Sequence, residues 1–159
     1  MTDPVGLPLT ATLSRIADPQ TALPEALGLC AETIGNSLFT AMRFHAATIE
    51  VERLYSTLPD VYPVSGRKPK RDTEWGDKVL LQQQVNRGYG KADIEWAFSD
   101  HETILGLGLH AVLNVPIVRR ETVLGTINFL RSAPAFNDQE ILTAQHLAAA
   151  LAARSDQLT

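Results

Sequence analysis

Two consecutive apolar runs, Ala111–Arg119 (AVLNVPIVR) and Thr122–Arg131 (TVLGTINFLR), decide the fold of this chain. Only Arg120 and Glu121 separate them, which is the spacing of a two-residue hairpin turn, although neither residue type is ideal for that turn. Nearly every position in both runs is apolar, and this predicts two strands whose faces are both covered. Adjacent strands joined by so short a turn indicate an antiparallel sheet.

Further strands and helices are expected on either side of this hairpin. Residues 38–45 and 49–56 predict two more strands, the second alternating so that Val51, Arg53 and Tyr55 share one face. Helices are expected at 7–17, from about 20 to Ile34, from Asp72 to Gln84, from a capping box at Ser99 and Glu102, and after Asn137 with Glu140 at its third position. Helices combined with an antiparallel sheet predict an α+β fold.

Composition narrows the class of protein. The chain has 159 residues, of which 45% are apolar and 20% charged, so we expect a single domain over residues 1–159. The formal net charge of −4 argues against nucleic-acid binding, which needs a basic surface. Cys30 is the only cysteine, so no internal disulfide can form, and one cysteine with four dispersed histidines predicts no metal site.

The sequence shows no targeting signal. Met1–Pro4 lacks the basic start and apolar centre of a signal peptide, and no apolar run approaches the ~20 residues that span a bilayer. We therefore expect a cytoplasmic protein that does not contact membranes.

Three segments resemble the GAF domain family: Gly108–Ile117 (GLHAVLNVPI), Val123–Leu130 (VLGTINFL) and Phe136–Glu140 (FNDQE) before an Ala/Leu-rich helix. The resemblance covers a core of about residues 20–155. It implies an antiparallel sheet with the terminal helices on one face, often forming a homodimer. The central helices and loops would cover the other face and enclose a ligand. The motifs leave the function open, because GAF domains host many ligands.

A second group of segments, which includes Tyr55–Pro59, Tyr62–Val64 and Gly66–Lys70, resembles short stand-alone bacterial GAF proteins. Two known activities of the family need cysteines that this chain lacks. Bilin attachment requires a cysteine in the pocket-lining region, and residues 72–107 contain none; free methionine sulfoxide reductases require a set of cysteines. No cofactor is expected.

The resemblance places the ligand pocket between the sheet and residues 62–107. Six side chains of this segment are candidates for ligand contact: Trp75, Tyr89, Asp93, Trp96, Asp100 and His101. Aromatic walls with a few polar groups suit the recognition of small molecules. The tryptophans can equally be core packing, and Asp100 with His101 can be an exposed pair at a helix start.

Three further candidates are basic or amide side chains. Arg67, in the basic loop 67–71, could clamp a carboxylate or phosphate with two hydrogen bonds, or the loop could be solvated. Arg43 interrupts an apolar strand and needs an anionic partner, either a ligand or a glutamate across the hairpin. Asn114 is a buried amide that must bond to a ligand or to sheet neighbours.

Three hypotheses about function stay open at this point. The first is a small-molecule-binding GAF module, a sensor or regulator whose ligand is anionic. The alternative is a small metabolite-processing enzyme that uses Asp93, Asp100 or His101 as acid–base groups in the same pocket. The third is a protein-interaction scaffold without a ligand.

Overall fold

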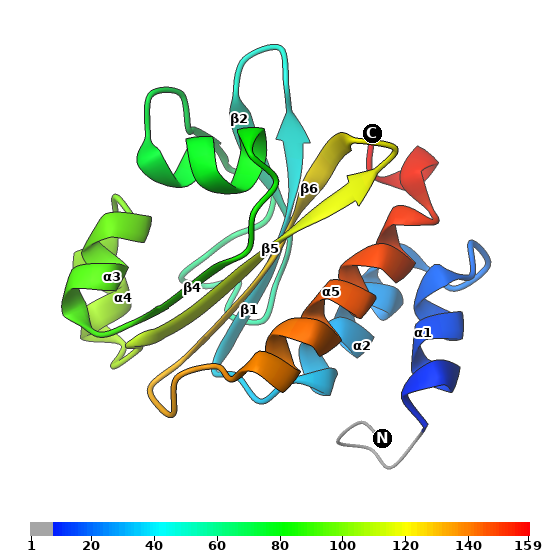
Figure 1. The fold of residues 1–159 in the computed structure, drawn as a ribbon, viewed down its shortest axis with the longest axis horizontal. Helices are drawn as coiled ribbons and strands as arrows, with labels where there is room; N and C mark the ends of the chain where they lie inside the picture. Colours follow the sequence, from blue (N-terminus) through cyan, green and yellow to red (C-terminus); the bar gives the residue numbers. More distant parts are fainter. Residues whose placement is uncertain (1–7) are drawn as a thin grey trace.

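The computed structural model describes residues 8–159, and in these residues one sheet carries helices on both faces (Figure 1). The strands are β1 (Leu38–His45), β2 (Glu50–Ser56), β3 (Arg67–Pro69), β4 (Asn86–Tyr89), β5 (Ala111–Arg119) and β6 (Thr122–Arg131). The helical segments are α1 (Leu9–Ala17), α2 (Leu23–Thr33), the π-helix η1 (Gly76–Leu81), α3 (Lys91–Ala97), α4 (His101–Gly106), α5 (Asp138–Ala152) and the short 3-10 segment η2 (Ser155–Gln157). The predicted first residue of the first helix, Leu7, and the segment Met1–Pro4, in which no signal peptide is expected, lie outside the described residues.

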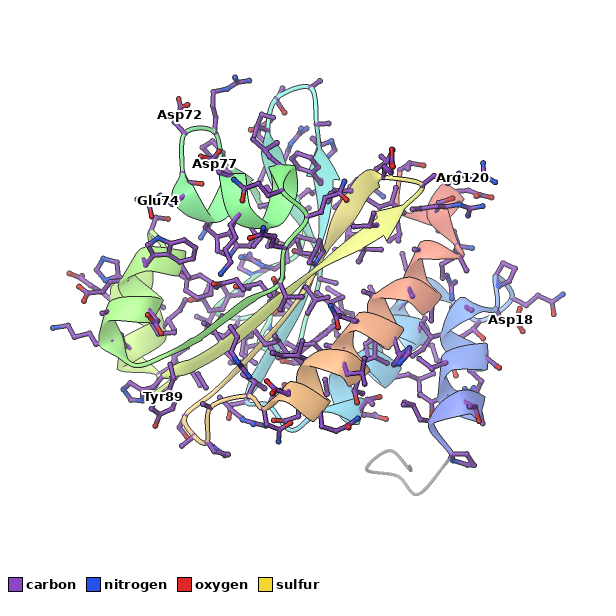
Figure 2. The ribbon with its side chains drawn as sticks, in the orientation of Figure 1. Asp18, Asp72, Glu74, Asp77, Tyr89 and Arg120 are labelled. Carbon is purple, nitrogen blue, oxygen red and sulfur yellow. The ribbon has the colours of Figure 1, made fainter. Side chains whose placement is uncertain are left out.

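The sheet has the strand order β3-β2-β1-β6-β5-β4, and every neighbouring pair is antiparallel. This confirms the predicted α+β fold class. β5 and β6 have the predicted bounds, and their two-residue turn places Arg120 and Glu121 at φ angles of 49° and 67°. Figure 2 shows Arg120 at the tip of this hairpin. Both residues adopt a left-handed conformation that glycine or asparagine would adopt with less strain.

The helices α2 and α5 cover one face of the sheet, and α1 packs against both of these helices (Figure 1); we call this the terminal-helix face. The predicted capping box begins α5: Asn137 Oδ1 accepts from the Glu140 amide at 2.8 Å, and Glu140 Oε1 accepts from the Asn137 amide at 3.0 Å. The rings of Phe39 and Phe129 meet edge-on beneath these helices, with centroids 5.0 Å apart.

The segments η1, α3 and α4, with the connection between β2 and β3, cover the opposite face, which we call the cavity face (Figure 1). The prediction that Asp72 caps a helix here was wrong. Asp72 sits in a turn at a φ of 61°, and the Thr73 hydroxyl instead accepts from the Gly76 amide at 2.9 Å. The segment that follows is wound as a π-helix, a form often found at functional sites.

Two other local predictions need correction. The helix α4 begins at His101 with Asp100 as its N-cap residue and without a side-chain capping bond, so Ser99 and Glu102 form no capping box. The alternation predicted for β2 also breaks, because Ala41 pairs with Tyr55 while the next residue of β1, Met42, pairs with Arg53. The extra residue makes a β-bulge that puts Arg53 and Tyr55 on opposite faces. Bulges commonly re-aim a side chain beside a functional site.

Candidate functional site

An inner cavity of about 50 Å³ lies between the cavity face of the sheet and its cover. Its apolar walls include Leu38, Met42 and Ile104, and its polar walls come from both layers. A space of this size has room for a few water molecules, whereas sites for drug-sized ligands measure ~300–1,000 Å³. The cavity as it stands therefore fits a small polar group.

Three basic side chains line the inner cavity: Arg53, Lys68 and Lys70. The register of the sheet explains why Lys68 points inward. Lys68 pairs with Val51, a buried residue that also lines the cavity, so the two side chains lie on the same face. Arg67 lies on the other face, where its guanidinium is 3.2 Å from Glu50. Because successive side chains of a strand point to opposite faces, the adjacent cations Arg67 and Lys68 lie on opposite sides of the sheet.

Arg53 lies on β2 directly before the bulge, whose extra residue is Leu54. Its guanidinium sits over the Tyr62 ring at 5.0 Å from the centroid, and it donates to the Pro63 carbonyl at 2.9 Å. Its Nε is buried, and within residues 8–159 no hydrogen-bond partner satisfies it. Burial lowers the pKa of Arg53, and the negative charge of Asp100 partly offsets this decrease. The guanidinium nevertheless stays charged, as it does in proteins generally. A buried hydrogen-bond donor without an acceptor costs free energy, and this cost is removed when a ligand or a water molecule accepts its hydrogen bond.

Lys70 extends over the Trp75 ring, with its ammonium nitrogen 5.0 Å from the ring centroid. Within the described part of the chain, the ammonium group makes no hydrogen bond or ion pair with a protein side chain. Burial lowers the pKa of Lys70, and the neighbouring charge of Lys68 lowers it further. The negative charge of an anion bound beside the ammonium group would oppose both effects, so this lysine is placed to receive one.

Asp100 is the acidic side chain of the inner cavity. The Tyr62 hydroxyl donates to its Oδ2 at 2.9 Å, and the Lys68 ammonium lies 3.4 Å from its Oδ1. Burial alone would raise the pKa of Asp100, but the Tyr62 hydrogen bond and the Lys68 charge together lower it. Burial and the Asp100 hydrogen bond raise the pKa of Tyr62. The Tyr62–Asp100 bond also ties the β2–β3 connection to the start of α4.

A row of polar side chains crosses the floor of the cavity. The sheet register aligns Asn86, Asn114, Asn128 and Thr40 on four neighbouring strands. Asn86 donates to Asn114 at 3.0 Å, Asn114 donates to Asn128 at 2.9 Å, and Asn128 donates to the Thr40 hydroxyl at 3.2 Å. We call this row the amide ladder. In the amide ladder, buried polar side chains satisfy one another's hydrogen bonds, which apolar side chains in the floor could not do.

Trp75 joins the cover to the amide ladder. Its indole Nε1 donates to Asn114 Oδ1 at 3.0 Å, and the side chain is only 3% exposed. The next residue must be glycine, because a Cβ on Gly76 would lie 2.4 Å from the Lys70 carbonyl oxygen. This close approach holds Lys70 and Trp75 beside each other at the edge of the cavity.

Of the predicted site residues, the structure places Trp75, Asp100 and Asn114 on the inner cavity. It places Arg43 and Arg67 on the terminal-helix side of the sheet. Arg43 lies 3.6 Å from Glu52 and donates to the Leu158 carbonyl at 3.2 Å. Arg43 shares a strand face with Phe39 and Ala41, so the period of two turns it away from the cavity.

The other four predicted residues do not line the inner cavity. Tyr89 is 50% exposed and projects from the end of β4 (Figure 2), and its backbone amide donates to Asp93 at 2.8 Å. Trp96 is 39% exposed and donates to Glu74 at 2.6 Å. His101 is half-buried on the outer side of α4. Of the three side chains that the enzyme hypothesis offers as alternative acid–base groups, Asp100 lines the inner cavity, whereas Asp93 and His101 do not.

Sequence reasoning missed Arg53, Tyr62, Lys68 and Lys70 as cavity residues. From the basic loop 67–71, the sequence analysis named Arg67 as a site residue. Lys68 and Lys70 alternate with Arg67 along the chain, and these two lysines line the cavity instead. Arg53 keeps the face that it shares with Val51, and the bulge at Leu54, which leaves no signal in the alternation of β2, turns Tyr55 to the other face. Within residues 8–159, no three His, Cys, Asp or Glu side chains gather as a metal site would need, and no helix is both long and apolar enough to cross a membrane.

Comparison with known proteins agrees with this architecture. The family model for the GAF domain matches residues 18–154. The GAF domain of a phosphoenolpyruvate-protein phosphotransferase from Coxiella burnetii superposes with a TM-score of 0.75 at 17% identity, covering 94% of this chain and 93% of that one. The phycocyanobilin-bound GAF domain of a cyanobacterial phytochrome gives 0.74 at 15% identity, covering 95% of each chain.

The second GAF domain of DevS from Mycobacterium smegmatis is also similar, with a TM-score of 0.65 at 16% identity over 88% of this chain and 94% of that one. At these identities the likeness concerns the fold alone. Among curated proteins, none has significant similarity to this sequence.

Proposed function

This chain belongs to the GAF domain family, and we propose that it binds a small anion in its inner cavity as a sensory or regulatory module. GAF domains are ligand-binding sensory modules. The observation that supports an anionic ligand is the charge balance of the cavity. Arg53, Lys68 and Lys70 face it, while Asp100 is the acidic side chain beside them and is already engaged by Tyr62 and Lys68. Arg53 Nε and the Lys70 ammonium group are left for the ligand.

Binding would tighten the cover on the sheet. Arg53 and Lys68 lie on β2 and β3, whereas Lys70 belongs to the turn that leads into η1. An anion held by all three would join these segments, and the ordered cover could then be read by a partner protein. This is how a change in ligand concentration would become a change in shape.

Thermal unfolding with a panel of small anions tests the proposal. Acetate, malonate and phosphate are added as sodium salts at constant ionic strength, with chloride as the reference. A binding anion present at about ten times its Kd stabilises the fold by ~1.4 kcal/mol. For a domain of this size, that raises the Tm by about 3–6 °C. The proposal fails if no anion of the panel raises the Tm above the chloride reference.

Two neighbouring residues provide a matched pair of variants. Lys68→Gln removes a cation from the cavity, and Arg67→Gln removes an equal charge from the opposite face of the same strand. Lys68→Gln should reduce the anion-induced rise in Tm, and Arg67→Gln should leave it unchanged. Equal losses in both variants would mean that net charge, and not the cavity, attracts the anion.

We also propose that two copies associate through the outward side of α5. Leu142 is 48% exposed there, and Ala149 and Ala153 leave the same side of the helix smooth enough for close packing. Light scattering coupled to gel filtration should give the mass of a dimer for the native chain and of a monomer for Leu142→Arg. A native chain with the mass of a monomer contradicts this proposal.

A further inference from the structure

A second, larger hollow lies beside the inner cavity, on the outer side of the cover. Its volume is about 310 Å³, and Trp96 and His101 are among the residues that line it. Four residues line both spaces: Lys70, Trp75, Ala97 and Phe98. These side chains therefore form a partition between the inner cavity and what we call the outer hollow.

The two spaces differ in size and in chemistry. The inner cavity of about 50 Å³ carries the charges of Arg53 and Lys68, but it is too small for most metabolites. The outer hollow of about 310 Å³ reaches the ~300–1,000 Å³ of ordinary ligand sites, and the indoles of Trp75 and Trp96 line it. A ligand that occupies both spaces would have an anionic head and a flat apolar body.

The partition contains two fixed and two movable side chains. Trp75 and Ala97 are 3% and 4% exposed, and Trp75 is bonded to the amide ladder. Lys70 and Phe98 are only half-buried. Within the described residues the Lys70 ammonium group has no hydrogen bond or ion pair to lose, and Phe98 has no polar side-chain atom. Rotation of these two side chains would join the two spaces without breaking a hydrogen bond.

We propose that the ligand is an aromatic acid whose acid group enters the inner cavity and whose ring lies against Trp75 and Trp96 in the outer hollow. This inference rests on the proposed function and adds the chemical class of the ligand. Arg53 and Lys70, the two cations left for a ligand, would bind the acid group, with Lys68 beside them. Indole rings attract a second ring in offset or edge-on contact, beyond the gain from burying its area.

Calorimetric titration with three matched compounds tests the inference: acetate, phenylacetate and the neutral phenylacetamide. Phenylacetate should bind roughly tenfold more tightly than acetate or better, because the added ring buries apolar surface. Phenylacetamide should bind more weakly than phenylacetate by a similar factor, because it lacks the charge. If acetate binds and phenylacetate binds no more tightly, the aromatic inference is overturned and anion binding stands. If neither acid binds, both proposals are overturned, and equal affinity for phenylacetamide overturns the role of the charged head.

Substitutions at Trp96 locate the ring contact. Trp96 is 39% exposed, so its truncation spares the core. Trp96→Ala should remove most of the preference for phenylacetate over acetate, and the affinity for acetate should not change. Trp96→Phe, which keeps a ring but loses the hydrogen bond to Glu74, should retain the preference. Leu107→Ala, at the similarly exposed Leu107, should behave like the native chain. A loss in Trp96→Phe as large as that in Trp96→Ala, or no loss in either, overturns the inference.

Discussion

The two faces of the sheet use the same strands for different purposes. On the terminal-helix face, apolar side chains form one continuous cluster that includes Phe39, Ile127 and Phe129, each fully buried. On the cavity face, the apolar side chains form two smaller clusters, one around Leu38 and one around Val51. The sheet register places the amide ladder between them. One face therefore provides a continuous core, and the other gives up continuous packing for a polar floor that can recognise a ligand.

The largest contrast should come from removing a phenylalanine from each face. Phe39→Ala should lower the free energy of unfolding by about 3–5 kcal/mol, because a fully buried ring in contact with Phe129 and Tyr55 leaves a cavity. Phe98→Ala should lower it by about half as much, since Phe98 is half-buried beside existing empty space. Urea denaturation measures both. Equal losses would contradict the division between a continuous and an interrupted core.

The amide ladder should give the next largest effect. Asn114→Leu leaves the Trp75 indole, the Asn86 amide group and the Asn128 carbonyl oxygen without their partner. We expect a loss of about 2–4 kcal/mol in the free energy of unfolding, since each buried orphan group costs about 1–3 kcal/mol and some will find water. In a double-mutant cycle with Trp75→Phe, the two losses should be less than additive. Additive losses would mean that the Trp75–Asn114 bond does not link cover and floor.

An ion pair joins the sheet to the last helix on the terminal-helix face, between Arg131 on β6 and Glu140 on α5, with N–O distances of 2.8 Å. Burial would raise the pKa of Glu140, but Arg131 and the Asn137 amide lower it overall. A lowered folded-state pKa means that the ion pair stabilises the fold above the unfolded pKa, about 4.3, and is lost as the pH falls through the lower folded value. Glu140→Gln should remove about 1.5–3 kcal/mol at neutral pH.

The same variant should unfold with a weaker pH dependence than the native chain below pH ~4, where the native glutamate itself becomes protonated. Urea midpoints measured from neutral to acidic pH give this comparison. A native and a variant curve that stay parallel down to acidic pH would show that Glu140 is not the group responsible.

The smallest effect is expected at the hairpin tip, which belongs to neither face. Glu121 has a φ of 67°, a left-handed conformation that a side chain disfavours. Glu121→Gly should raise the free energy of unfolding by about 1 kcal/mol. The affinity for acetate should stay the same, because Glu121 is not among the residues that line the inner cavity. An unchanged stability would mean that the turn stores no strain.

The sequence predicted the apolar strands and the capped terminal helix better than the polar inner cavity. The first and last residues of β5 and β6 agree with the prediction, because unbroken apolar runs are a strong sequence signal for buried strands. The start of α5 was likewise predicted by its capping box. These features depend on neighbours in the sequence, and such local rules can be applied without knowledge of the fold.

The inner cavity depends on long-range register, which the sequence does not display. Lys68 faces inward because it pairs with Val51, and Arg53 faces inward because it shares the face of Val51 on β2, whereas the bulge at Leu54 turns Tyr55 to the other face. The start of α4 was predicted one residue early, with Ser99 instead of Asp100 as the N-cap residue. Tyr62, which donates to the Asp100 carboxylate, lies 38 residues earlier in the chain, so local rules do not show this contact. Asn114 was predicted to be a buried amide in need of partners, but only the fold shows that those partners are the amides of Asn86 and Asn128 and the indole of Trp75.

The most direct test of anion binding on the cavity face uses the two tryptophans of the chain as reporters. Trp75 lines the inner cavity and donates to Asn114, whereas Trp96 lies outside it and donates to Glu74. In nitrogen-15 spectra titrated with acetate, the indole resonance of Trp75 should move with saturation and that of Trp96 should stay in place. A resonance of Trp75 that does not move, or movement of Trp96 alone, would contradict the account.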